Sequence, residues 1–110
     1  MREAEFRAWL DKRLWKGNPL TKKAKGNRVR RNLRAERGLQ GLGFEQTTLE
    51  AVFDEGLWEA LITRLVQLRD DPSADLATIR SVVPQADDPK GQLSNMIAAM
   101  KQYGFFLEGR

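Results

Sequence analysis

The 110-residue chain contains no histidine and no cysteine. The commonest general base and the usual transition-metal ligands are therefore missing, and no disulfide can form. Any metal site would have to be built from oxygen atoms alone. The aspartates that stand out lack the spacing of a metal-binding loop, and capping and turn roles explain them: Asp70, Asp71, Asp75, Asp87 and Asp88. We therefore expect no enzymatic activity, no catalytic residue, no metal and no cofactor.

Long apolar runs are absent as well. The longest uninterrupted apolar segment has only a few residues, so the sequence predicts no membrane-spanning helix. The N-terminal segment MREAEFRAWLDKR mixes acidic and basic residues and lacks the apolar block of a signal peptide. Together with the absence of cysteine, this pattern favours a cytoplasmic location.

What the chain does contain is typical of a globular protein, because 41% of its residues are hydrophobic and 31% are charged. Its length suits one domain with a modest core, so we expect a single helical domain over residues 1–110. No segment alternates with the period of a strand for long enough to form a sheet. The sequence therefore predicts an all-α fold, a compact bundle of four to five helices.

Apolar spacing and capping residues define the expected helices. They cover residues 3–16, 22–37, 47–69, 75–82 and 89–108. Thr21, Thr47, Asp75 and Asp88 are the expected N-caps, and Pro84 is expected to stop the fourth helix. Gly56 marks a point where the third helix kinks or divides. Gly26 costs the second helix about 1 kcal/mol relative to alanine.

Apolar stripes along these helices predict the core. Its expected members are Phe6, Trp9, Leu10, Leu14, Val29, Leu33, Leu49, Val52, Phe53, Leu57, Trp58, Leu61, Leu65, Leu68, Leu93, Met96, Ile97, Met100, Tyr103, Phe105, Phe106 and Leu107, with Leu39, Leu42 and Phe44 tucked on from a glycine-rich loop. Trp15 lies one residue off the first stripe. Packing against the core is favoured for it, over flanking a binding surface.

Positive charge is concentrated in one segment. Residues 22–37 contain eight basic residues and one acid, Glu36, a net charge of +7, so the other 94 residues together carry −3. A charge tuned only for solubility would be spread over the surface. On a helical wheel of about 100° per residue, one arc of about 120° holds five cations and an amide: Lys23, Arg30, Arg31, Arg34, Arg37 and Asn27. Val29 and Leu33 lie away from this arc. The segment therefore predicts a helix with one strongly basic face.

A basic face of this kind favours a polyanionic ligand. Arginine presents a planar fork that suits phosphates and base edges. We expect Lys23, Arg30, Arg31 and Arg34 to bind phosphates, and Asn27 and Arg28 to approach a groove. If Asn27 and Asn32 face a groove, their side chains suit adenine. The alternatives that remain open are RNA in place of DNA, an acidic partner protein, and a solvated face with no ligand. A membrane is the weakest option, because the helix lacks an aromatic face.

Three segments also carry a resemblance: EFRAWLDKRL, then NPLTKKAKGNRVRRNLRAERGL, and near the other end LSNMIAAMKQYGFFLEG. They resemble the N-terminal core-binding (SAM-like) domain of tyrosine recombinases and phage integrases. The match covers about half of the chain. It implies a helical clamp that meets duplex DNA through the second helix, as a phage-related accessory module. The contacts implied, with Arg37 added from the charge pattern, are Thr21, Lys22, Lys23, Lys25, Asn27, Arg28, Arg30, Arg31, Arg34 and Arg37.

The same comparison defines what is missing. The recombinase catalytic domain, with its arginine, histidine and tyrosine set, is absent, and Tyr103 falls on an apolar stripe. Binding without cleavage is therefore expected. If the basic helix instead docks on an acidic protein, a phage- or plasmid-type interaction factor is the alternative.

Overall fold

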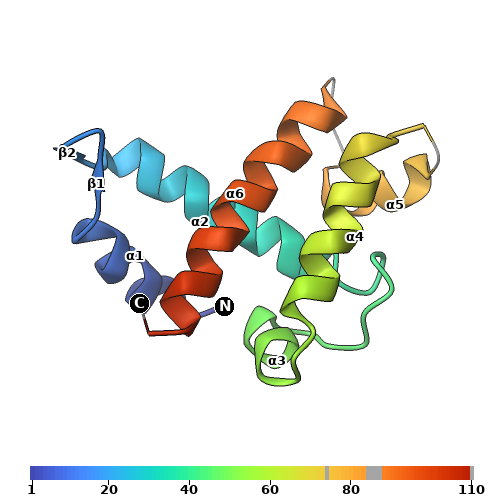
Figure 1. The fold of residues 1–110 in the computed structure, drawn as a ribbon, viewed down its shortest axis with the longest axis horizontal. Coiled ribbons are helices and arrows are strands. Elements are labelled where there is room, and N and C mark those ends of the chain that lie inside the picture. Colours follow the sequence, from blue (N-terminus) through green and yellow to red (C-terminus); the bar gives the residue numbers. More distant parts are fainter. Residues whose placement is uncertain (74, 84–87, 110) are drawn as a thin grey trace.

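The computed structural model describes residues 1–73, 75–83 and 88–109. Pro84 and Asp87 lie outside these residues. The elements in the described ranges are α1 (Glu3–Asp11), β1 (Leu14–Trp15), β2 (Asn18–Pro19), α2 (Lys22–Arg37), α3 (Leu49–Asp54), α4 (Trp58–Asp70), α5 (Leu76–Val82) and α6 (Pro89–Leu107) (Figure 1). The two strands form a two-residue hairpin. The expected all-α class is confirmed, with six helices in the described part of the chain.

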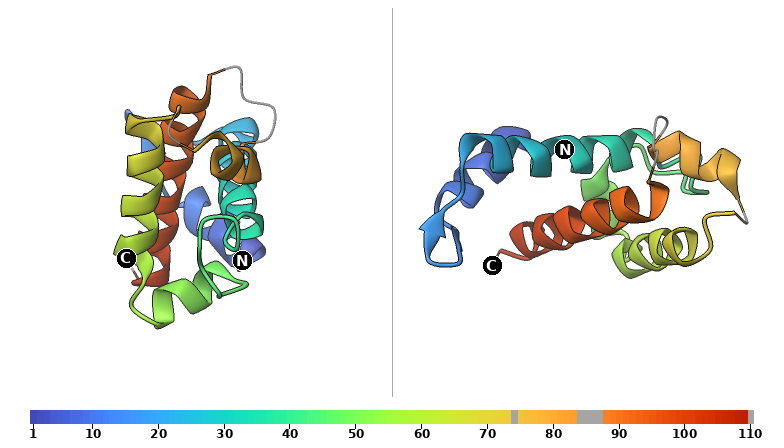
Figure 2. Two further views of the ribbon diagram at one scale, coloured as in Figure 1. Left: turned by 90° about the vertical axis from the view of Figure 1, so that its right-hand side faces the viewer. Right: turned by 90° about the horizontal axis from the view of Figure 1, so that it is seen from above.

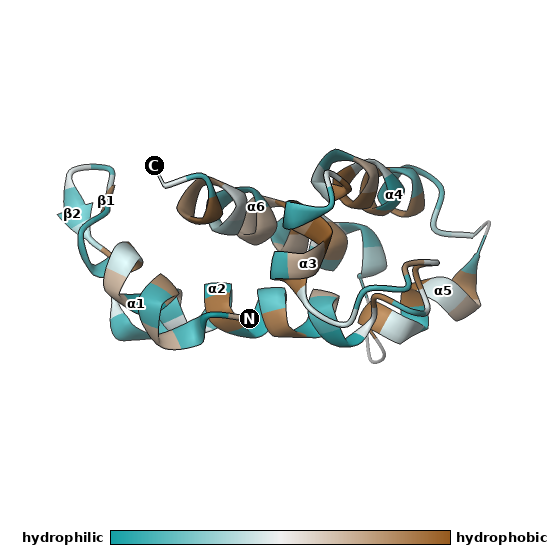
Figure 3. Cartoon of the chain, turned by 90° about the horizontal axis from the view of Figure 1, so that it is seen from below, coloured by the Kyte–Doolittle hydropathy of each residue, from teal (hydrophilic) through white to brown (hydrophobic). Residues whose placement is uncertain are grey.

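Four of the helices form two layers (Figure 2). One layer holds α1 and α2, and the other holds α4 and α6. The packing of α6 against α4 and against α2 is the most extensive between any two elements. Figure 3 shows apolar segments along the helices of both layers, and their buried side chains form one continuous core. Helix α2 also contacts α1 and α5, and the rest of its surface is left for solvent or a ligand.

The first helix ends earlier than predicted. It stops at Asp11, and Leu14 pairs with Pro19 and Trp15 with Asn18 in an antiparallel hairpin. Lys16 and Gly17 form the turn with positive φ values of 52° and 82°, as a tight two-residue hairpin turn requires. As a result Leu14 is 65% exposed and Trp15 is 59% exposed. The prediction that both pack on the core is wrong.

The expected third helix is two helices, α3 and α4. Gly56 adopts a positive φ of 75°, which a continuous helix cannot accommodate, and Leu57 N–H donates to Val52 O at 2.9 Å to close the bend. The N-cap is Thr48 rather than Thr47, because the Thr48 side chain accepts from Ala51 N–H. The caps Thr21, Asp75 and Asp88 are confirmed.

Most of the predicted core is buried. Its fully buried members include Phe6, Leu10, Leu61, Leu65 and Tyr103. Phe105 is the exception among the aromatic residues expected on the apolar stripes, since its side chain is 43% exposed. Trp58 rests on α6 at Gly104, where an added Cβ would lie 2.7 Å from Trp58 Nε1. The absence of a side chain at Gly104 thus lets α4 and α6 approach closely.

A partly buried polar network ties α2, α3 and α6 to the N-terminal residues. The Met1 amine donates to Glu36 Oε2 at 2.8 Å, and the Arg2 amide donates to Glu50 Oε1 at 3.0 Å and to the Tyr103 hydroxyl at 2.8 Å. Tyr103 in turn donates to Glu50. Glu36, the one acid of α2, also accepts from Leu49 N–H at 3.0 Å. Tyr103 therefore has a structural role, as expected.

This network makes folding stability depend on pH through Glu50. Burial opposes ionisation of Glu50, but hydrogen bonds from Tyr103 and Arg2 and the charge of the Met1 amine outweigh it and lower the pKa of its carboxyl below its usual range. A depressed pKa in the folded state adds stability above the unfolded pKa, and this stability is lost as pH falls through the folded value. We expect Glu50→Gln to be less stable than wild type at pH 7, with the difference shrinking below about pH 4.

Urea unfolding between pH 3 and pH 7 measures this effect. The exposed residue Glu45 supplies a control, and the Glu45→Gln curve should run parallel to that of the wild type. If the free energies of unfolding of wild type and Glu50→Gln differ by the same amount at every pH, this role of Glu50 is contradicted.

Candidate nucleic-acid interface on α2

Helix α2 begins and ends where the sequence predicts. The Thr21 hydroxyl accepts from Ala24 N–H at 3.1 Å, which satisfies one of the free amides of the first turn. At the other end, Gly38 N–H donates to the carbonyl oxygens of Arg34 and Ala35 at 3.0 and 3.1 Å. Thr21 is thus a capping residue, and its side chain fixes the point from which the basic residues are displayed.

The buried side of α2 is made of small and polar residues. Gly26, Val29, Asn32 and Ala35 are buried, while Leu33 is only partly so. The helix is therefore rotated about its axis relative to the prediction, which was centred on Val29 and Leu33. The rotation turns the side of α2 that carries Arg28 and Arg31 toward α6, and it leaves the side that carries Lys23, Arg30 and Arg37 to solvent.

The outer face of α2 is defined here as Lys22, Lys23, Arg30, Arg34 and Arg37, all exposed. Within residues 1–73, 75–83 and 88–109, no carboxylate forms an ion pair with any of these five. Arg30 donates to the Asn27 side-chain oxygen, a neutral partner. Glu36 is turned inward to the Met1 amine and does not offset the outer face. Five cations thus remain uncompensated along one side of the helix.

Two other predicted residues have partners inside the protein. Lys25 forms an ion pair with Asp11 of α1. Arg28 donates through Nε to Gln102 Oε1 at 2.7 Å and through its terminal nitrogen to Ala24 O at 3.1 Å. Burial and repulsion from Arg31 lower the pKa of the Arg28 guanidinium. Lys25 therefore belongs to the α1–α2 packing, and Arg28 is held against α6.

Asn32 does not face a groove in a ligand. Its side chain is fully buried, and Nδ2 donates to Arg28 O at 2.9 Å and to Ala99 O at 3.2 Å, linking α2 to α6. The prediction that Asn32 reads adenine is wrong. Asn27 accepts from Arg30 and remains near the exposed cations.

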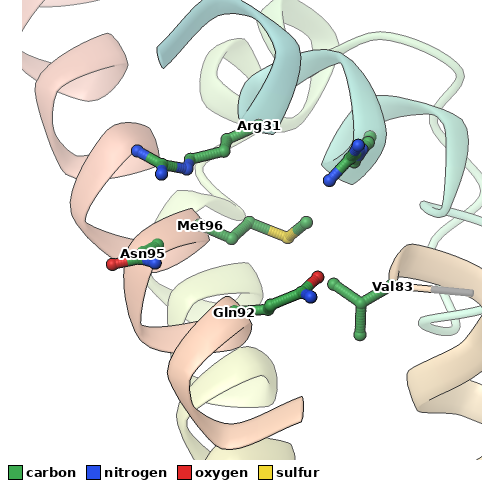
Figure 4. Close-up of a pocket in the computed structure, with 6 residues that line it drawn as sticks. Arg31, Val83, Gln92, Asn95 and Met96 are labelled. Carbon is green, nitrogen blue, oxygen red and sulfur yellow. The ribbon is translucent and has the colours of Figure 1, made fainter. Parts of the chain in front are cut away.

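Between α2 and α6 runs a groove made of two adjoining hollows. One, of about 250 Å³, is lined by Arg31, Arg34, Val83, Gln92, Asn95 and Met96. The other, of about 270 Å³, is lined by Trp15, Arg28, Arg31, Asn95, Ala98, Ala99 and Gln102. Arg31 and Asn95 line both. Figure 4 shows Arg31 extending from α2 toward the α6 turn that bears Asn95. We call this feature the α2–α6 groove.

The amide side chains of the α2–α6 groove were not predicted. Gln92, Asn95 and Gln102 lie at spacings of three and seven, which places them on one side of α6. The spacing of these amides can be read from the sequence. They can be assigned to a groove only when α6 is known to lie beside the arginines of α2. Trp15 could not be assigned to the groove, because its position depends on the hairpin.

Among the described residues, no group of three or more acidic side chains is placed to hold a metal ion. No helix in the described ranges is both long and apolar enough to cross a membrane. No family model matches the sequence, and comparisons with curated proteins and with solved structures found no match either. The resemblance to recombinase core-binding domains therefore stays a prediction.

Proposed function

We propose that this protein binds duplex DNA without cleaving it, as a binding protein or accessory module, through phosphate contacts from the outer face of α2. The observation that carries the proposal is the set of five exposed cations without a carboxylate partner in the described structure. A helix face that served only for solubility would gain from alternating glutamates, since like charges at i and i+4, such as Arg30 and Arg34, repel.

The dimensions of α2 suit this ligand. Its 16 residues extend about 24 Å at 1.5 Å per residue. Over that length a DNA duplex presents roughly 14 phosphates, at one charge per 1.7 Å of axis. One duplex can therefore receive contacts from all five cations of the outer face. This use of the second helix agrees with what the resemblance implies.

Fluorescence anisotropy with a labelled 20-base-pair duplex at low salt tests the proposal. We expect saturable binding, with unlabelled duplex competing for the site. Absence of binding at low salt would overturn it. A pull-down after nuclease treatment tests the alternative function, docking on an acidic partner protein. Recovery of one acidic protein, in an amount that added duplex does not change, would favour a protein-interaction module.

A further inference from the structure

The hairpin places an aromatic side chain where the α2–α6 groove begins. Trp15 is the most exposed of the three tryptophans, since Trp58 is 9% exposed and Trp9 is partly buried. The indole lines the same hollow as Arg28, Arg31 and Gln102. The hairpin that holds it is fixed by the Lys16–Gly17 turn and lies at one end of the molecule (Figure 1). Lys16 Nζ, at the end of a flexible side chain, lies 5.9 Å from the centre of the indole ring, so a base that stacks on this ring would displace it.

The walls of this hollow differ in chemistry. Arg28 and Arg31 of α2 supply positive charge, and Asn95 and Gln102 of α6 supply amide groups. Gln102 accepts from Arg28 through Oε1, and Asn95 is exposed. Within the described part of the chain, the Gln102 Nε2 group and the Asn95 amide make no hydrogen bond, so both remain for a ligand. Ala98 and Ala99 form a small apolar wall between them.

Together these groups match the parts of one nucleotide. The indole offers a stacking surface for a base, the amides offer donors and acceptors for its edge, and the guanidinium groups offer charge for its phosphate. The base of an intact duplex cannot use such a site, because its faces are covered by neighbouring base pairs. An unpaired or extruded base exposes both its faces and its pairing edge.

We propose that the hollow between Trp15, α2 and α6 binds an unpaired DNA base, stacked on the Trp15 indole, next to the duplex held by the outer face of α2. This inference rests on the proposed duplex binding and adds a preference for DNA that carries an unpaired nucleotide. Arg31 and Asn95 also line the neighbouring hollow of the groove. There Arg34 provides positive charge and Gln92 an amide group for the adjoining nucleotide.

The test compares two labelled duplexes of the same sequence, one fully paired and one with a single bulged 2-aminopurine. Stacking on an aromatic side chain contributes about 1–3 kcal/mol per base. We therefore expect wild-type protein to bind the bulged duplex about tenfold more tightly, with a change in 2-aminopurine fluorescence on binding. Trp15→Ala should remove the preference and leave affinity for the paired duplex within about twofold.

Two controls separate stacking from general damage to the hairpin. Trp15→Phe keeps an aromatic ring and should retain most of the preference. Leu14→Ala removes the neighbouring exposed side chain, which does not line the groove, and should change nothing. Equal affinity of wild type for the two duplexes, or a preference that persists in Trp15→Ala, would overturn this inference. Failure to bind the paired duplex, with binding of the bulged one intact, would instead overturn the proposed duplex binding.

Discussion

Reversing Arg30 and Arg34 to glutamate is expected to weaken binding to paired duplex DNA by about 100-fold or more at 0.1 M salt. The double variant removes two phosphate contacts and replaces them with two repulsions, each on the order of 1 kcal/mol in water. Both side chains are exposed, so the fold should be unchanged. Anisotropy titration measures the affinity, and far-UV circular dichroism checks the fold.

A matched control separates the position of the charges from the net charge. Arg80→Glu with Lys101→Glu changes the net charge by the same amount, from +4 to 0, at two exposed positions on α5 and α6. This variant should bind duplex within a few-fold of wild type. If the two double variants lose affinity equally, the outer face of α2 has no special role, and a general electrostatic attraction explains binding.

Two glycine-to-alanine substitutions inside helices are expected to change stability in opposite directions. At Gly104 the new Cβ would lie 2.7 Å from Trp58 Nε1 and 3.2 Å from Cε2, so a rigid, mostly buried indole would have to move. We expect Gly104→Ala to lower the free energy of unfolding by about 1–3 kcal/mol. At Gly26 the new Cβ would meet only the Arg30 guanidinium, at 3.2 Å, which is the end of a flexible side chain.

Gly26→Ala should therefore raise the free energy of unfolding by about 0.5–1 kcal/mol, the usual gain of alanine over glycine in a helix. Urea unfolding measures both variants. Trp58→Leu combined with Gly104→Ala should be less destabilised than the sum of the single changes, because the clash is then absent. A Gly104→Ala variant as stable as wild type would contradict the close packing of α4 on α6.

Local signals predicted the helices well, because a cap acts through its own side chain. Thr21 and Asp88 lie within hydrogen-bond reach of amides three residues ahead, and both are caps in the structure. The choice between Thr47 and Thr48 could not be made in this way, since either threonine can cap and the preceding loop decides. The hairpin was missed because two residue pairs are too few to show a strand period.

The rotation of α2 about its own axis could not be predicted from the sequence, for a different reason. An apolar pattern detects Val29 and Leu33, but it does not detect a helix surface buried through glycine, alanine and a hydrogen-bonded asparagine. Gly26, Asn32 and Ala35 are all buried, and Asn32 is held against α6 by its hydrogen bond to Ala99 O. The basic character of the helix was predicted correctly. The division of its cations between an outer face and a groove, with Arg34 at the edge that the two share, was not.

The central claim is that uncompensated cations on the outer face of α2 bind the phosphates of duplex DNA, and the salt dependence of the affinity tests it most directly. If all five cations of that face each neutralise one phosphate, log K should fall linearly with log[salt] with a slope of about −4.5. The Arg30→Glu, Arg34→Glu variant should show a slope smaller in magnitude by about 2. A wild-type slope near zero would contradict the claim.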